Sequence, residues 1–170
     1  YHSVSVVGDA LDKEIDVDRK LALEAMVGSA NCDYYDGTGI YKQLGYVPYD
    51  VKSTGSSMTL EYAYDDWCIL QVARKLNRPQ AELDKWAARA RNYRNVFDPE
   101  TRLMRGRLRD GKFQAPFSPY KWGGAFTEGN SWHYTWSVFH DVEGLVDLMG
   151  GREQFVQMLD SVFVVPPIYD

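Results

Sequence analysis

The sequence predicts a mainly α-helical fold built from helices in pairs. Apolar residues recur every three or four positions over most of the chain, and joints rich in Gly, Pro and Asp separate the helical segments. The predicted helices are 3–13, 17–27, 58–76, 80–95, 131–149 and 152–163. Paired helices of this kind form bundles, solenoids or toroids, and the periodicity does not choose among the three.

The first two helices are predicted from their apolar spacing and their end signals. Val4, Val7 and Leu11 lie on one face of the first helix. Asp16 is a suitable N-cap for the second helix, because a short acidic side chain can accept hydrogen bonds from the free N–H groups of the first turn. Gly28 is a suitable stop.

The middle of the chain is predicted to alternate between loops and helices. Residues 29–56 are loop-like, with a short helical turn possible at 39–44. The third helix follows Ser57 and carries Glu61 near its start, where the helix dipole favours an acid. Pro79 suits the first position of the fourth helix, because its missing N–H costs nothing there.

A small β-hairpin is expected between the fourth and fifth helices. Residues 98–101 indicate a turn, and strands are predicted at 103–108 and 112–113. Asp110 and Gly111 supply the turn between these strands, since an Asp-Gly pair favours the tight turns of hairpins. The predicted fold class is therefore mainly α with a small β-hairpin.

Composition excludes several classes of function. The chain has 170 residues, of which 45% are hydrophobic and 25% charged, as in a globular domain. Its net charge of −5 argues against a nucleic-acid partner, which requires a basic face. No apolar run approaches the roughly 20 residues of a membrane span. The two cysteines, Cys32 and Cys68, fit no zinc pattern, and whether they pair cannot be derived from the sequence.

The strongest candidate for acid chemistry is Glu128, at the end of an aromatic loop. Trp122, Phe126 and Trp132 surround it in the sequence, just before a predicted helix. Aromatic neighbours can desolvate a carboxyl group and raise its pKa, as a general acid requires, whereas a helix start favours the anion. The alternative is that Glu128 only stabilises the start of the helix.

A second candidate is the acidic and aromatic segment 60–67, which contains Asp65 and Asp66. Adjacent helical residues point about 100° apart, so only one of the two can face a given site. We interpret this segment as facing a ligand. The three histidines do not form a metal triad. The loop at 31–37 lacks the acid at the third ligand position of a calcium loop and has Lys42 where the bidentate Glu should be, so metal ligands are not identified.

Three motifs, in the same order along the chain, resemble glycoside hydrolase family 92. The first lies at 59–67, the second at 97–101 leading to 104–107, and the third at 127–136 with 139–145 and 149–151. Two positions depart from the usual pattern of that family. The chain has His133 where the family usually has Gln, and Phe139 where it usually has Pro.

The resemblance implies an exo-acting, calcium-dependent α-mannosidase that inverts the anomeric configuration of terminal α-linked mannose. Glu128 would be the catalytic acid, and the substrate-binding residues would be Asp66, Trp122, Asn130 and Trp132. The catalytic base is expected downstream of this chain. The implied catalytic domain is an (α/α)6 toroid of paired helices packed against an N-terminal β-rich domain.

Residues 1–170 are accordingly expected to be an internal segment of a larger catalytic domain. The β-rich domain and the C-terminal part of the toroid are expected to be absent, and the remainder of the domain is an expected partner. The isolated segment should be inactive, and the family implies a secreted, periplasmic or cell-surface location. The alternatives are a non-catalytic glycan-binding module and a helical interaction fragment.

Overall fold

The computed structural model describes residues 1–166, which are mainly helical as predicted. Its helices are α1 (Ser3–Asp12), α2 (Arg19–Asn31), α3 (Thr38–Leu44), α4 (Gly55–Lys75), α5 (Gln80–Arg89), α6 (Ser131–Tyr134), α7 (Val142–Leu148) and α8 (Arg152–Ser161), with a 3₁₀-helix at Asn92–Val96. Strands β1 (Phe97–Asp98) and β2 (Leu103–Met104) form an antiparallel pair in which Phe97 lies opposite Met104. The toroid stays a prediction.

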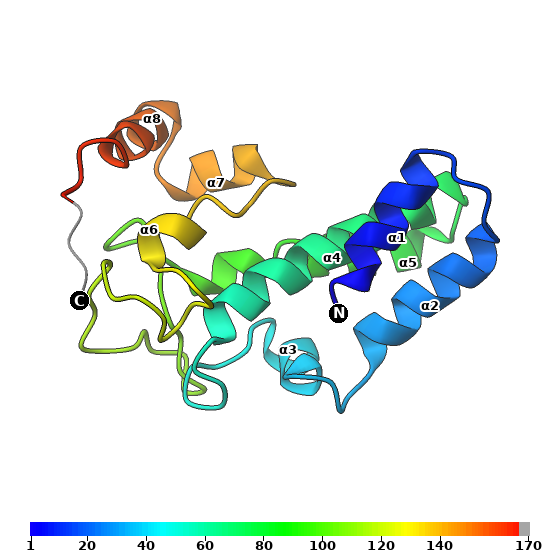
Figure 1. Ribbon diagram of the computed structural model, residues 1–170, viewed down its shortest axis with the longest axis horizontal. Helices are drawn as coiled ribbons and strands as arrows, with labels where there is room; N and C mark the ends of the chain where they lie inside the picture. Colours follow the sequence, from blue (N-terminus) through cyan, green and yellow to red (C-terminus); the bar gives the residue numbers. More distant parts are fainter. Residues whose placement is uncertain (167–170) are drawn as a thin grey trace.

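Helix α4 is the central element of the fold. It has 21 residues and lies at the centre of the molecule, with α1, α2 and α5 around one end and α6 near the other (Figure 1). It packs against α1, α2, α5 and the 3₁₀-helix, and most of its side chains are buried. A helix that is apolar around most of its circumference is stable only when neighbours cover it on several sides.

Two hydrophobic cores share α4. The first lies where α1, α2 and α5 pack on its C-terminal half, and its fully buried members include Val4, Met26, Ile69 and Trp86. The second joins the N-terminal half of α4 to the strand pair, the aromatic loop and the last helices. Its members include Leu60, Tyr93, Met104, Phe126 and Leu145.

The boundaries of α2 differ from the prediction. Asp18, rather than Asp16, is the N-cap, and its Oδ1 accepts hydrogen bonds from the backbone N–H groups of Lys20 and Leu21 at 3.0 and 3.1 Å. The helix also continues past Gly28 to Asn31. A glycine within a helix costs only about 1 kcal/mol, and the burial of Ala30 on the following turn offsets it.

The predicted helix 131–149 is wrong, because the segment is divided between α6 and α7. Two tertiary hydrogen bonds hold the connection between them. His140 Nε2 lies 2.8 Å from the carbonyl oxygen of Ala90, and Tyr93 donates a 2.6 Å hydrogen bond to Asp141. Asp141 in turn accepts from the N–H of Gly144 at 3.1 Å and so caps α7.

The fourth helix and the hairpin are also corrected in detail. Helix α5 ends at Arg89, and the 3₁₀-helix at Asn92–Val96 follows it after a short turn, in place of the continuous helix predicted to residue 95. The turn predicted at 98–101 is present, but it joins the two short strands β1 and β2. The hairpin predicted farther along is reduced to a single bridge between Arg107 and Phe113, with Leu108 N–H donating to Lys112 O at 2.8 Å.

Candidate active site

Glu128 lies at the tip of the loop 114–130 and is exposed to solvent. Its backbone has φ 50°, in the left-handed region that non-glycine residues rarely adopt. Such a conformation persists only when the surrounding structure imposes it, and it is concentrated at functional sites. The rest of the loop therefore holds the backbone of Glu128 in this conformation, while its side chain is exposed.

The start of α4 anchors this loop. The backbone N–H groups of Ser56 and Ser57, in the first turn of α4, point at the carbonyl oxygen of Ala125 at 3.2 and 3.3 Å. Ser57 Oγ accepts from the N–H of Thr127 at 3.2 Å. The free donors of a helix N-terminus thus bind the loop that carries Glu128.

Helix α6 holds the same loop from its other side. Tyr134 donates a 2.6 Å hydrogen bond to the carbonyl oxygen of Thr127, and its ring stacks on Phe126 with centroids 5.2 Å apart. Within the loop, Gly123 N–H donates to Gly129 O at 2.8 Å. A Cβ at Gly129 would lie 2.9 Å from the ring of Tyr134, so only glycine allows this approach.

Asn130 is buried and is used inside the protein. Its Oδ1 accepts from His133 N–H at 3.2 Å, and its Nδ2 donates to Tyr120 O at 3.3 Å. In this chain the polar atoms of Asn130 cap α6 and hold the loop, and its role in substrate binding stays a prediction. The sequence signal was present, because Asn is among the preferred N-cap residues.

The two predicted tryptophans differ in how much of their side chains is exposed. Trp122 is 51% exposed, and its ring meets that of His133 edge to face at 5.6 Å. It directly precedes Gly123, whose N–H donates to Gly129 O, and so it lies at the base of the loop that carries Glu128. Trp132 is half-buried, and its Nε1 has no hydrogen-bond partner among the described residues. Trp122 is therefore the more accessible surface for a sugar ring.

Asp66 is 0% exposed, and its predicted contact with substrate stays a prediction. Arg89 binds both of its oxygens, with Nη2 to Oδ1 at 2.8 Å and Nε to Oδ2 at 2.9 Å. Tyr1 and Tyr41 donate hydrogen bonds to the two oxygens at 2.9 and 2.8 Å. A buried carboxylate persists when it is paired and hydrogen-bonded in this way, and such a group has a structural role.

Asp65 and Glu61 belong to the segment 60–67 that the sequence analysis interprets as facing a ligand, although only Asp66 of that segment is a predicted site residue. They lie one turn apart on α4 and line a cavity of about 440 Å³ together with Tyr134 and Phe139. Asp65 is only 2% exposed, and its Oδ2 has no hydrogen-bond partner among the described residues. Burial raises the pKa of Asp65 to about 8. The four-residue spacing could have indicated a shared face.

Tyr134 connects this cavity to the loop of Glu128. Burial, and then the negative charges of Glu61 and Glu128, raise the pKa of the Tyr134 phenol. Glu61 also pairs with His2 at 3.2 Å, and burial raises the pKa of the Glu61 carboxyl. The site that the structure assembles therefore runs from Glu128 past Tyr134 to the acidic face of α4.

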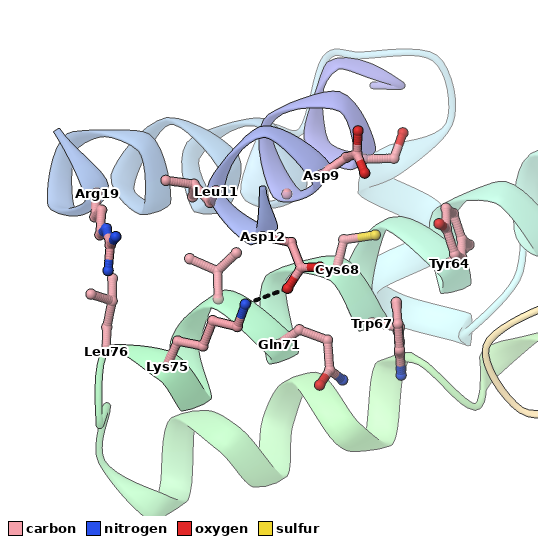
Figure 2. A pocket seen from close by; sticks show the side chains of 13 residues that line it. Asp9, Leu11, Asp12, Arg19, Tyr64, Trp67, Cys68, Gln71, Lys75 and Leu76 are labelled. Carbon is pink, nitrogen blue, oxygen red and sulfur yellow. Dashed lines mark hydrogen bonds and ion pairs between the residues drawn. The ribbon is translucent and has the colours of Figure 1, made fainter. Parts of the chain in front are cut away.

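A separate cleft of about 370 Å³ lies between α1 and α4 (Figure 2). Lys75 of α4 and Asp12 of α1 form an ion pair across it, and the buried thiol of Cys68 lines it. None of the predicted site residues lines this cleft. We therefore do not assign it to the site of Glu128.

Within residues 1–166, no group of three or more His, Cys, Asp or Glu side chains is arranged to hold a metal ion. The same part of the chain contains no helix long and apolar enough to cross a membrane.

Comparison with known proteins identifies the family. The family model described as "Glycosyl hydrolase family 92 catalytic domain" matches residues 1–169. A protein of Arthroderma benhamiae described as an uncharacterized secreted glycosidase is 30% identical, over 91% of this chain and 25% of its own length. The chain thus spans about a quarter of that relative.

Solved structures agree with this match. The family GH92 α-mannosidase BT3965 of Bacteroides thetaiotaomicron is 43% identical with a TM-score of 0.91, over 97% of this chain and 22% of its own. The family GH92 inverting mannosidase BT2199 of the same organism is 45% identical with a TM-score of 0.88, over 94% of this chain and 22% of its own. The chain belongs to the catalytic domain of glycosyl hydrolase family 92.

Proposed function

We propose that the complete protein hydrolyses terminal α-linked mannose from glycans with inversion of configuration, and that Glu128 is its catalytic acid. The observation that carries this proposal is the strained, exposed backbone position of Glu128 within a chain of this family. Its neighbours of known structure are described as mannosidases, one of them as inverting. The structure of BT3965 with mannoimidazole adds a ligand of the same sugar type to these comparisons.

In the proposed mechanism, Glu128 donates its proton to the glycosidic oxygen as the bond to the sugar breaks. A second carboxylate removes a proton from the attacking water on the opposite face of the ring. In inverting enzymes the two carboxyl groups are roughly 6.5–9.5 Å apart. We propose that the second carboxylate comes from another segment of the protein, so the chain of 170 residues alone should not hydrolyse mannosides.

The other parts of the domain have a second task in this proposal. Glu128 is exposed in this chain, and we propose that a further segment or the substrate excludes water from it during the reaction. Apolar residues exposed on and after α8, among them Val156, Val162 and Phe163, support packing against the remainder of the catalytic domain.

Calcium assistance is a further expectation from the family. The described residues contain no cluster that fits a metal ion, and the proposed steps involve Glu128, a second carboxylate and water. We propose that the ligands of a Ca²⁺ come from other segments. We also propose a secreted, periplasmic or cell-surface location, which the description of the fungal relative supports.

The test compares Glu128→Gln with the wild type in the complete protein on two substrates. General acid catalysis contributes roughly 10²–10⁴-fold, so a natural α-mannoside should lose activity on that scale. An activated aryl mannoside, whose leaving group departs without a proton, should lose much less. A glycan-binding module or a helical interaction fragment would hydrolyse neither substrate. An equal loss on both substrates with a lowered Tm would instead assign Glu128 a structural role.

A further inference from the structure

The cap of α6 contains an unusual reciprocal pair. Asn130 Oδ1 accepts from the backbone N–H of His133 at 3.2 Å, and His133 Nδ1 lies 3.1 Å from the backbone N–H of Asn130. This is a capping box, in which the third residue of the helix returns a hydrogen bond to the N-cap. Glu or Gln usually supplies that acceptor, whereas here an imidazole nitrogen does.

The geometry fixes the state of the imidazole. The Asn130 N–H is a donor, so Nδ1 must accept, and the ring proton must be on Nε2. A doubly protonated ring would place one N–H against another, and the capping bond would be lost. A glutamine side chain at the same position presents its carbonyl oxygen whatever the pH, so it would keep the bond.

The cap lies directly behind the catalytic acid. Asn130 is two residues beyond Glu128, and its side chain also holds Tyr120 O at 3.3 Å across the loop. The carboxylate of Glu128 has no hydrogen bond to another described residue, and the backbone of residues 128–130 sets the direction in which its side chain leaves the loop. Loosening the Asn130 N–H should therefore release the strained φ of Glu128 toward ordinary values.

The surroundings of His133 contribute few contacts to its ring. Its ring meets Trp122 at 5.6 Å, and among the described residues it takes part in no ion pair. The ionisable groups nearest to it along the loop and α6 are Lys121, Glu128, Tyr120 and Tyr134. Among the described residues no carboxylate lies within ion-pair distance of His133.

We propose that His133 is a positioning residue whose unprotonated Nδ1 holds the loop of Glu128 in its working conformation, so that turnover falls in mildly acidic solution in a way that glutamine at this position would prevent. The proposal rests on the proposed function for its kinetic readout. Its structural readout does not depend on activity.

The kinetic experiment uses the complete protein as wild type, His133→Gln and His133→Ala, with kcat/KM for an α-mannoside measured from about pH 5 to 8, where imidazole side chains change charge. The wild type and His133→Gln should agree within about threefold at the upper end. Toward the lower end the wild type should fall behind the glutamine variant by about 2- to 10-fold, the value of one hydrogen bond. His133→Ala should be lower by a similar factor at every pH. Parallel profiles for the wild type and His133→Gln, or full activity of His133→Ala, would overturn the proposal.

The structural experiment follows amide hydrogen exchange of the peptide 120–134 in the same proteins, corrected for the intrinsic effect of pH. Acid should speed exchange at residues 128–130 in the wild type relative to His133→Gln. If that difference is seen in a protein that does not cleave mannosides, the proposed function fails and the cap stands. If mannosides are cleaved and exchange is identical in the two proteins, the cap fails and the function stands.

Discussion

The hydroxyl of Tyr134 donates a 2.6 Å hydrogen bond to the carbonyl oxygen of Thr127, the residue that precedes Glu128. This bond ties helix α6 to the loop at the point where the backbone turns into its left-handed conformation. Tyr134 also borders the cavity that contains Glu61 and Asp65. One side chain therefore links the acid on the loop to the acids on α4.

Tyr134→Phe should lower kcat/KM in the complete protein by about 2- to 10-fold, because it removes one hydrogen bond and keeps the ring that stacks on Phe126. Steady-state kinetics on an α-mannoside measure the effect. Tyr34→Phe is the control, since Tyr34 is 94% exposed and lies on the connection between α2 and α3. An unchanged kcat/KM in Tyr134→Phe would mean that the bond does not position Glu128.

The left-handed φ of Glu128 predicts an unusual order of stabilities at this position. Glu128→Gly should be more stable than Glu128→Ala by about 1 kcal/mol, because glycine adopts positive φ without strain. Urea unfolding measures the difference. At Glu24, an exposed residue within α2, the order should reverse, since glycine costs a helix about 1 kcal/mol relative to alanine. The same order at both positions would contradict strain at Glu128.

Asp66→Asn should destabilise the protein by about 3–5 kcal/mol, because it leaves the guanidinium of Arg89 buried without its partner. The activity of the molecules that remain folded should not change, since the carboxylate of Asp66 is fully buried in its ion pair with Arg89. Unfolding in urea and active-site titration measure the two effects separately. Normal stability with a raised KM would instead support a substrate-binding role for Asp66.

The pH dependence of stability should contain a contribution from Asp65. Its folded-state pKa is raised by burial to about 8, above the ordinary value of 3.8. The folded protein therefore holds a proton that the unfolded chain releases, and this stabilisation is complete below the unfolded pKa and is lost as pH rises toward 8. Asp65→Asn should raise Tm at pH 8 and leave it nearly unchanged at pH 4.

Asp147→Asn is the matched control, because Asp147 is exposed on α7 and loses no hydration on folding. It should not change the slope of Tm against pH. If Asp65→Asn has the same slope as the wild type, Asp65 is ionised in the folded protein and the cavity is more hydrated than its burial indicates.

The sequence by itself determined the helical class, the positions of most helices and the loop that carries Glu128. These follow from local rules: apolar spacing, proline and glycine punctuation, and a motif whose residues are adjacent in the chain. The tertiary structure decided which of two adjacent acids is held in an ion pair. Spacing along α4 treats Asp65 and Asp66 alike, and only the packing of Arg89, Tyr1 and Tyr41 selects Asp66 for burial in an ion pair. The break between α6 and α7 could not be predicted for the same reason. The hydrogen bonds of His140 to Ala90 and of Tyr93 to Asp141 join segments about 50 residues apart, and no local sequence pattern predicts them.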